Sequence, residues 1–194
     1  MATLSVCVYC GSRVGTSPAH VAAARAVGHA IGERGWRLVY GGGRAGLMGA
    51  TADAALAAGA PVLGVIPQSL MEREVGHAGL SELRVVQTMH QRKQAMAEAA
   101  DVFLALPGGI GTFEELFEVW TWRQLGYHDK PIGLLNVDGY YDGLLGFMAR
   151  SVAEGFVSPD QNDLVQVDTD PSVLLDRLQA LAASAAAPDD YRRI

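Results

Sequence analysis

Short apolar runs alternate with amphipathic or alanine-rich stretches along nearly the whole chain. Seven runs rich in Val, Ile and Leu predict β-strands at Ser5–Tyr9, Arg37–Tyr40, Pro61–Ile66, Leu83–Val86, Val102–Leu106, Ile132–Leu135 and Leu164–Val167. The stretches between them predict helices over Pro18–Arg34 and Ser172–Ala183, with others beginning near Gly46, His90, Phe113 and Tyr140. Ser17 is the expected N-cap of the first helix, because Pro18 suits the position that follows a cap.

This alternation indicates βαβ units and therefore a parallel sheet. Continuous apolar strands such as Val102–Leu106 are typical of strands covered on both faces. We therefore expect the α/β class: a Rossmann-like, doubly wound parallel sheet of about seven strands, flanked by helices. In this interpretation one domain covers residues 1–183, and the tail, residues 184–194, is expected to be loose. Ligands of such folds bind at the carboxyl ends of the strands, so the loops there carry the functional argument.

The charge balance argues against several classes of partner. The 194-residue chain has 15 Lys and Arg residues against 21 Asp and Glu, a net charge of -6. A nucleic-acid binder needs a basic face, so nucleic acid is not an expected partner. No signal peptide is evident and no window approaches the ~20 apolar residues of a membrane span. We therefore expect no membrane contact and predict a cytoplasmic protein.

Cys7 and Cys10 have the C-x-x-C spacing, which fits a redox pair or half of a zinc site. Both lie in or at the end of the first predicted strand, where positions three apart point to opposite faces. No second C-x-x-C occurs, and the 5 histidines are scattered, so we predict no metal site.

The first glycine-rich loop, Gly41–Gly49, directly follows the strand Arg37–Tyr40. Its glycines allow a sharp turn and a close approach of the backbone to a ligand, or simply tight packing between strand and helix. Three of them match G-x-G-x-x-G, but a dinucleotide site also has an acidic residue after the next strand. That strand is followed by Pro67 and Gln68, so the pattern disfavours an NAD-dependent enzyme, which stays as an alternative.

The second glycine-rich loop, Pro107–Glu115, follows the strand Val102–Leu106 and would open a helix. The free N–H groups and the positive dipole end of such a helix bind phosphate, and glycines there leave room for it. No Gly-Lys-Ser/Thr follows, so the loop is not a Walker P-loop, and this disfavours chemistry on nucleoside triphosphates.

Two interpretations of Glu115 stay open on the local sequence. Thr112 and Glu115 have the spacing of a capping box, in which the carboxylate bonds back to the N-cap amide. Alternatively, Glu115 is catalytic, because helical spacing places it away from the apolar face and beside the phosphate site. That apolar face consists of Phe113, Leu116, Phe117 and Trp120, and the other side carries Glu114, Glu115, Glu118 and Trp122.

A basic pair lies in the segment Met89–Lys93, after the strand Leu83–Val86. Thr88 and Gln91 form a further possible capping box, which places Arg92 and Lys93 in or near a first helical turn. Exposed cations there oppose the helix dipole at a cost of roughly 0.3–1 kcal/mol each. The pair therefore indicates an anionic ligand, with a solvated basic face as the alternative.

Together these motifs resemble the LOG ("Lonely Guy") family of cytokinin riboside 5′-monophosphate phosphoribohydrolases. The resemblance rests on G-G-G-x-x-G-L-M-G at Gly41–Gly49, M-H-x-R-K at Met89–Lys93 and P-G-G-x-G-T-x-x-E at Pro107–Glu115, and extends from Cys7–Arg13 to the last helix. It implies a Rossmann-like homodimer that hydrolyses the N-glycosidic bond of an adenine-type nucleoside 5′-monophosphate. The products would be the free base and ribose 5-phosphate, and no cofactor or metal would be needed.

The resemblance also implies roles for individual residues. Glu115 would be the catalytic carboxylate and Arg92 its catalytic partner. From their chemistry we expect Glu115 to stabilise an oxocarbenium-like sugar and activate water, and Arg92 to hold the ligand and favour departure of the purine. The substrate-binding positions would be Ser12, Gly42, Gly43, Glu74, Met89, Lys93, Gly108, Gly109, Ile110, Gly111 and Thr112. Of these, Gly109–Thr112 would hold the 5′-phosphate.

Other interpretations compete with the hydrolase. Molybdenum-cofactor carriers are similar in fold and in the P-G-G-x-G-T loop, and they bind a phosphorylated pterin without turnover; the M-H-x-R-K block and Glu115 favour the hydrolase. The label "lysine decarboxylase", often given to the family, implies a Schiff-base lysine, and the chain has only Lys93 and Lys130. Whether the base is adenine or N6-prenylated adenine stays open: Met89 and Trp122 could border a prenyl pocket, or be core or dimer contacts.

Overall fold

The computed structural model describes residues 3–71, 76–77, 79–185 and 189–191. Each predicted strand is present, and each observed boundary lies within one residue of the predicted one. The strands are β1 (Ser5–Tyr9), β2 (Arg37–Tyr40), β3 (Val62–Pro67), β4 (Glu82–Val86), β5 (Val102–Ala105), β6 (Ile132–Leu135) and β7 (Val165–Asp168). This agreement arises because the apolar runs are short and β-branched and are bounded by turn residues.

The helices agree with the periodic stretches, with additions that are too short to have a period. They are α1 (Pro18–Glu33), α2 (Gly46–Ala57), α3 (Gln68–Met71), α4 (Met89–Glu98), α5 (Ile110–Gln124), α6 (Asp142–Ala153), α7 (Pro159–Asn162) and α8 (Pro171–Ala182), with a 3₁₀ turn, η1, at Val137–Gly139. Of these, α3, α7 and η1 were not predicted. Within the described ranges, no helix combines the length and the apolar character needed to cross a membrane.

Side chains cap two of the helices as expected. Ser17 Oγ accepts a hydrogen bond from Ala19 N at 3.2 Å at the start of α1, which confirms the predicted N-cap. Thr88 Oγ1 likewise accepts from Gln91 N at 3.1 Å at the start of α4. The second half of that capping box differs, because Gln91 Oε1 accepts from Gln87 N at 2.9 Å, one residue before the cap.

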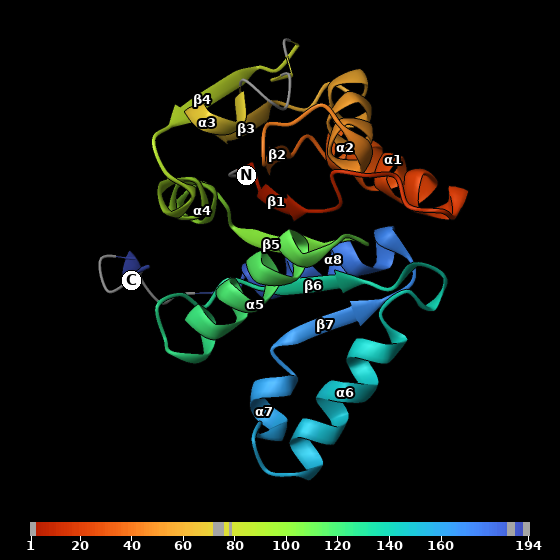
Figure 1. The fold of residues 1–194 in the computed structure, drawn as a ribbon, viewed down its shortest axis with the longest axis vertical. Coiled ribbons are helices and arrows are strands. Elements are labelled where there is room, and N and C mark those ends of the chain that lie inside the picture. Colours follow the sequence, from red (N-terminus) through yellow and green to blue (C-terminus); the bar gives the residue numbers. More distant parts are fainter. Residues whose placement is uncertain (1–2, 72–75, 78, 186–188, 192–194) are drawn as a thin grey trace.

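The seven strands form one parallel sheet in the order β4-β3-β2-β1-β5-β6-β7 (Figure 1). From β1 the chain winds outward to β4, and it then returns to the other side of β1 to add β5, β6 and β7. The predicted doubly wound, Rossmann-like architecture is therefore confirmed. Between β1 and β5 the connections diverge to opposite sides of the sheet, so this is the topological switch point where such folds bind ligands.

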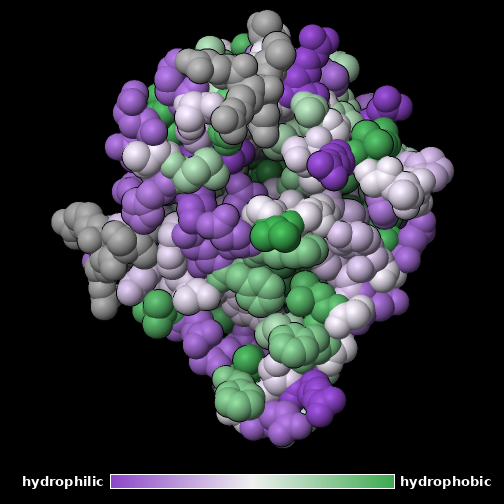
Figure 2. Space-filling model, viewed as in Figure 1, coloured by the Kyte–Doolittle hydropathy of each residue, from purple (hydrophilic) through white to green (hydrophobic). Residues whose placement is uncertain are grey.

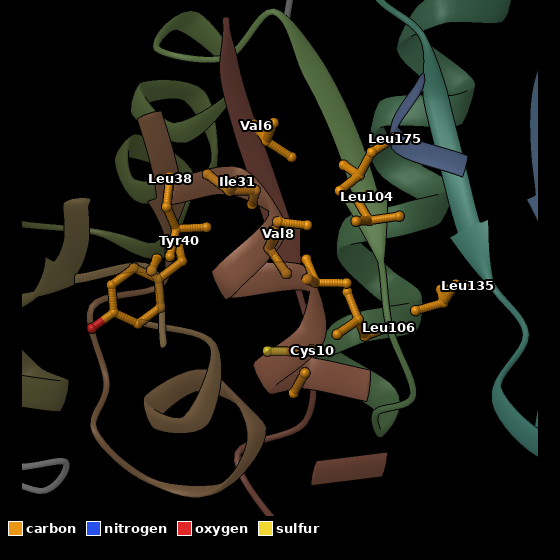
Figure 3. Close-up of a cluster of buried hydrophobic side chains, with 14 of the residues drawn as sticks. Val6, Val8, Cys10, Ile31, Leu38, Tyr40, Leu104, Leu106, Leu135 and Leu175 are labelled. Carbon is orange, nitrogen blue, oxygen red and sulfur yellow. The ribbon is translucent and has the colours of Figure 1, made fainter. Parts of the chain in front are cut away.

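Apolar side chains cover both faces of the sheet. One cluster packs the sheet against α1, α2 and α8, and the other packs it against α4, α5 and α6. Figure 3 shows the first, in which Val6, Val8 and Cys10 of the β1 segment point the same way as Leu104 and Leu106 of the β5 segment. Cys7 belongs to the second cluster, and both thiols are free and buried. The prediction that the two cysteines occupy opposite faces is therefore confirmed.

Part of the tail contacts the body of the domain. Asp189 forms an ion pair of 2.6 Å with Lys130, and Asp190 N donates to Tyr127 O at 2.9 Å. The Tyr191 ring is 5% exposed and packs edge-on against Trp122 with ring centroids 5.8 Å apart. The polar face predicted for α5 thus contains a buried tryptophan, because the tail supplies an apolar partner that helical spacing alone does not reveal.

Candidate functional site

A cavity of about 600 Å³ opens at the switch point between β1 and β5. The loops after these two strands form adjacent walls, and Gly11 N donates to Pro107 O at 3.1 Å between them. The cavity brings together eight of the predicted site residues, namely Ser12, Arg92, Gly108, Gly109, Ile110, Gly111, Thr112 and Glu115. Residues from three separate sequence motifs therefore meet in one place.

The amino end of α5 points its backbone into this cavity. Gly109 is the N-cap, and no side chain caps the helix. The first intrahelical bond runs from Phe113 N to Gly109 O, at 3.1 Å, and the preceding N–H groups of residues 110–112 make no bond to another described residue. A Cβ on Gly109 or Gly111 would meet no atom within 4 Å, so packing does not explain these glycines. Room for an anion on the free N–H groups does explain them.

The capping-box interpretation of Glu115 is wrong. Because α5 begins at Ile110 rather than near Phe113, Thr112 occupies the third helical position and is not a cap. Glu115 follows three positions later, on the second turn, where it lines the cavity. Thr112 is 3% exposed, and a Cβ on Gly108 would overlap its Oγ1, so this threonine and glycine pack closely together.

Glu115 is the single carboxylate among the described residues that line the cavity. Burial disfavours its charged form and raises the pKa of Glu115 from 4.5 to about 7. The charge of Arg92 opposes this rise, Glu114 and Glu118 add to it, and Lys93 opposes it. A carboxyl group with this pKa exchanges a proton near neutral pH, which suits general acid–base chemistry.

Arg92 is buried, at 8% exposure, yet no described carboxylate pairs with it. Its Nε donates to Val65 O at 3.2 Å, its Nη2 donates to Gly41 O at 3.1 Å, and Nη1 lies 3.8 Å from Met89 Sδ. Backbone carbonyls orient the guanidinium without neutralising it, so its positive charge is retained at the cavity. A Cβ on Gly41 would overlap the Arg92 guanidinium, which explains the glycine after β2.

Lys93 does not line the cavity, although it follows Arg92 directly. Its Nζ lies 2.9 Å from Glu114 and 2.8 Å from Glu118, so two carboxylates of α5 share its charge. Burial by itself would lower the pKa of Lys93, but the hydrogen bonds and charges of Glu118 and Glu114 raise it overall. Lys93 thus ties α4 to α5 next to the site.

The remaining predicted site residues lie beside the cavity or outside the described ranges. Gly42 and Gly43 are buried behind it and do not line it. Met89 is 40% exposed and does not line the cavity, but its Sδ lies 3.8 Å from Nη1 of Arg92, which does. Glu74 lies outside the described residues.

The cavity also has walls that the motifs did not indicate. Tyr140, in the turn after β6, donates its hydroxyl to Gly108 O at 2.5 Å and packs edge-on against His20, with centroids 5.5 Å apart. Arg13 and Met48 line it too; they lie within the Cys7–Arg13 and Gly41–Gly49 motifs but were not among the predicted site residues. Tyr140 reaches the loop after β5 because β6 pairs with β5, a neighbourhood that no local pattern reveals.

These observations define an α/β protein whose switch-point cavity combines a helix amino end, an arginine with no described carboxylate partner and a carboxyl group whose pKa is raised by burial. Residues 48–178 match the sequence profile of a family described as "Possible lysine decarboxylase". The chain is 54% identical, over 154 residues, to a cytokinin riboside 5′-monophosphate phosphoribohydrolase of Arabidopsis thaliana, an alignment of 79% of this chain and 71% of that protein. Over 177 residues it is 48% identical to a second Arabidopsis protein of the same name, covering 91% and 82% of the two chains.

The chain therefore belongs to the LOG family, whose motifs it shares. The similar proteins at about 50% identity are named phosphoribohydrolases, not decarboxylases. The chemistry of the lysines agrees with those names: Lys93 is paired with Glu114 and Glu118, and Lys130 Nζ donates to Ala97 O at 2.9 Å and pairs with Asp189. Neither lysine lines the cavity, where a Schiff base would have to form.

Solved structures with this fold include more distant proteins. The molybdenum cofactor binding protein of Rippkaea orientalis superposes with a TM-score of 0.72 at 21% identity, over 93% of this chain and 98% of that one. The molybdenum cofactor carrier protein of Chlamydomonas reinhardtii superposes with a TM-score of 0.70 at 21% identity, over 94% and 99%. At this level of identity the likeness establishes the fold alone, because unrelated functions share such folds.

The raised pKa of Glu115 predicts that this carboxylate destabilises the fold at alkaline pH. Between pH 4.5 and about 7 the folded state binds more protons at Glu115 than the unfolded state does, so its contribution to stability falls as the pH rises through that window. The neutral variant Glu115→Gln should therefore be more stable than wild type at pH 8. In urea unfolding, its free energy of unfolding should be higher by on the order of 2 kcal/mol at pH 8, with only a small difference at pH 5.

The control is Glu98→Gln, which changes an exposed carboxylate of α4 that bonds Gln94 and does not act on Glu115. This variant should gain no stability at pH 8. Equal stabilities of wild type and Glu115→Gln at both pH values would show that Glu115 is not held in a desolvated place.

Proposed function

We propose that this protein hydrolyses the N-glycosidic bond of an adenine-type nucleoside 5′-monophosphate. The observation that carries the proposal is the placement of Glu115 and Arg92 in one cavity with the free amino end of α5. The relatives at about 50% identity are named for this reaction on cytokinin riboside 5′-monophosphates, which supports the same reaction here. A carrier function has no comparable support, since the carrier proteins are similar in fold only.

In this proposal the 5′-phosphate binds at the amino end of α5. The N–H groups of residues 110–112 donate to its oxygens, and the helix dipole favours its charge. Tyr140 fixes the loop by its bond to Gly108 O, so the donors are held in place before the ligand arrives. Binding the phosphate, remote from the bond that breaks, holds the sugar in a defined orientation at the catalytic groups.

The reacting bond joins the sugar C1′ to the nitrogen of the base. As that bond breaks, its electron pair leaves with the base, and the ribose develops positive charge as in a glycosidase. The Glu115 carboxylate stabilises this charge and accepts a proton from the water that attacks C1′. Water supplies the new C–O bond and the proton that the base finally carries, so the products are free base and ribose 5-phosphate.

Arg92 places a retained positive charge beside the departing base. Val65 O and Gly41 O take two of its five N–H groups and Met89 Sδ lies near a third, so two are left for the ligand. An arginine stays protonated at ordinary pH, so it holds and polarises the ligand and does not donate a proton. Of the other implied contacts, Ser12 lies at the cavity, while Gly42, Gly43, Met89, Lys93 and Glu74 stay predictions from the family resemblance.

The homodimer and the cytoplasmic location also belong to this proposal. Figure 2 shows apolar surface over α5 and α6 on the face in view. Phe147 of α6 is 64% exposed, and Leu125, just after α5, is 52% exposed. An exposed apolar patch such as the one over α5 and α6 is typical of a surface that a second protein covers.

We predict that the purified protein releases free base from AMP or from N6-isopentenyladenosine 5′-monophosphate, and chromatography of the reaction mixture measures that base. Glu115→Gln should reduce kcat by at least about 100-fold while nucleotide binding persists, because the reaction loses its base and charge stabiliser. Glu98→Gln, an exposed carboxylate of α4 that bonds Gln94, serves as the control and should leave the rate unchanged. Binding of both nucleotides by wild type without any base release would contradict the proposal and favour a carrier.

The phosphate site predicts the behaviour of Gly111→Ala. A Cβ at residue 111 meets no protein atom within 4 Å, so the variant should fold with unchanged or slightly raised stability. It would narrow the place of the phosphate and raise KM for AMP on the order of tenfold, as expected when one charge-assisted hydrogen bond is weakened. An unchanged KM would place the phosphate elsewhere.

For the dimer, sedimentation equilibrium should give twice the 20.5 kDa mass of one chain. Phe147→Asp would put a charge into the apolar contact and shift the protein toward monomer. The matched change Val173→Asp, on an exposed valine of α8, should not alter the mass. A monomeric wild type would refute the dimer.

A further inference from the structure

Gly76 and His77, which follow α3 in the chain, lie against the glycine-rich loop after β2. Gly76 forms an isolated antiparallel bridge with Gly43, and His77 N donates to Gly42 O at 3.3 Å. Gly42 has φ +76, and a Cβ on it would press on Ile66 and Leu83. Gly76 and His77 therefore pack on the backbone of this loop, next to Gly41, whose carbonyl accepts a hydrogen bond from Arg92.

His77 is anchored through both of its ring nitrogens. Nδ1 accepts a hydrogen bond from Gly79 N at 3.3 Å, so the ring hydrogen is on Nε2. Nε2 donates to Asp53 Oδ1 of α2 at 2.8 Å. The histidine is 6% exposed, whereas the Asp53 side chain is 62% exposed. One buried histidine thus joins α2, Gly79 and the loop after β2.

The same loop carries the acceptor that orients the candidate catalytic arginine. Gly41 O receives the Nη2 hydrogen of Arg92 at 3.1 Å, and Gly41 is one peptide away from the residue that His77 holds. Val65 O, the other acceptor of Arg92, lies in β3, which pairs with β2. A shift of the glycine loop would therefore move the guanidinium relative to Glu115.

We propose that His77 is a positioning residue for the reaction proposed above: its bond to Asp53 holds residues 76–77 against the Gly41–Gly43 loop and thereby keeps the Arg92 guanidinium in place. His77 does not line the cavity, so its effect reaches the ligand only through the loop and Arg92. The expected effect on kcat rests on the proposed function, whereas the expected effect on the position of the Arg92 guanidinium does not.

The two nitrogens can be tested separately with amide side chains. In His77→Gln the new amide can place its NH₂ group near the position of Nε2 and keep the bond to Asp53. His77→Asn keeps an acceptor near the position of Nδ1 for Gly79 N, but it loses Asp53, and His77→Ala loses both bonds. His29→Gln is the matched control, because His29 also faces a carboxylate, Glu33 at 3.2 Å, but on the exposed surface of α1.

With AMP as substrate, His77→Ala and His77→Asn should lower kcat on the order of tenfold to 100-fold, as small displacements of a catalytic group do, and change KM much less. His77→Gln should recover most of the rate, and Asp53→Ala should reproduce the loss. Wild-type kcat in His77→Ala, or a loss equally large in His77→Gln and His77→Ala, would overturn the assignment.

A second readout does not need turnover. The Nε–H of Arg92, bonded to Val65 O, should give a slowly exchanging ¹⁵N–¹H signal that is identified by its loss in Arg92→Lys. His77→Ala should speed its exchange with solvent, whereas His77→Gln and His29→Gln should not. Unchanged exchange in His77→Ala refutes the inference, while an inactive wild type with this exchange pattern refutes only the proposed reaction.

Discussion

The burial of the Arg92 guanidinium against two backbone carbonyls constrains much of the surrounding structure. A buried cation is normally paired with an anion, and here the oxygens of Gly41 and Val65 hold it instead. The loop after β2 must therefore begin with a glycine, because a side chain would occupy the place of the guanidinium. The carboxyl ends of β2 and β3 and the amino end of α4 are consequently fixed relative to one another, and the cavity keeps a positive charge.

The two neighbouring cations Arg92 and Lys93 thus have different environments. Lys93 is paired with Glu114 and Glu118, which ties α4 to α5, whereas Arg92 keeps its charge for the cavity. The charges of Arg92 and Lys93 also act on the pKa of Glu115. Burial raises the pKa of Glu115 to about 7, the Arg92 charge limits the rise, and Glu114 and Glu118 add to it. The carboxyl group is therefore destabilised in its charged form where the proposed reaction needs it, a cost typical of functional sites.

The fold of this chain is more widely shared than its site residues are. Proteins that bind or carry the molybdenum cofactor superpose on nearly the whole chain at about one-fifth identity, and phosphoribohydrolases of plants share about half of its residues. The sheet with a helix amino end at its switch point is a general platform for phosphorylated ligands. The chemistry proposed for this chain depends on Glu115 and Arg92 on that platform, and the motif residues around them distinguish the family from the fold.

The amino-acid sequence determined the sheet, because seven short apolar runs separated by helical periods leave little freedom in strand identity, and parallel order follows from the alternation. The glycine and arginine motifs also located the carboxyl-end loops that meet at the cavity. The helix α5 begins at Ile110, three residues before the start that the sequence predicts, because the glycines of the loop hide the helical turn from a pattern based on apolar spacing. Only the tertiary structure decided that Glu115 is not a cap, that Lys93 pairs with α5 and that Tyr140 and His77 contact the loops around the site. These outcomes depend on which elements become neighbours in space, and contacts between residues far apart in the chain have no local signature.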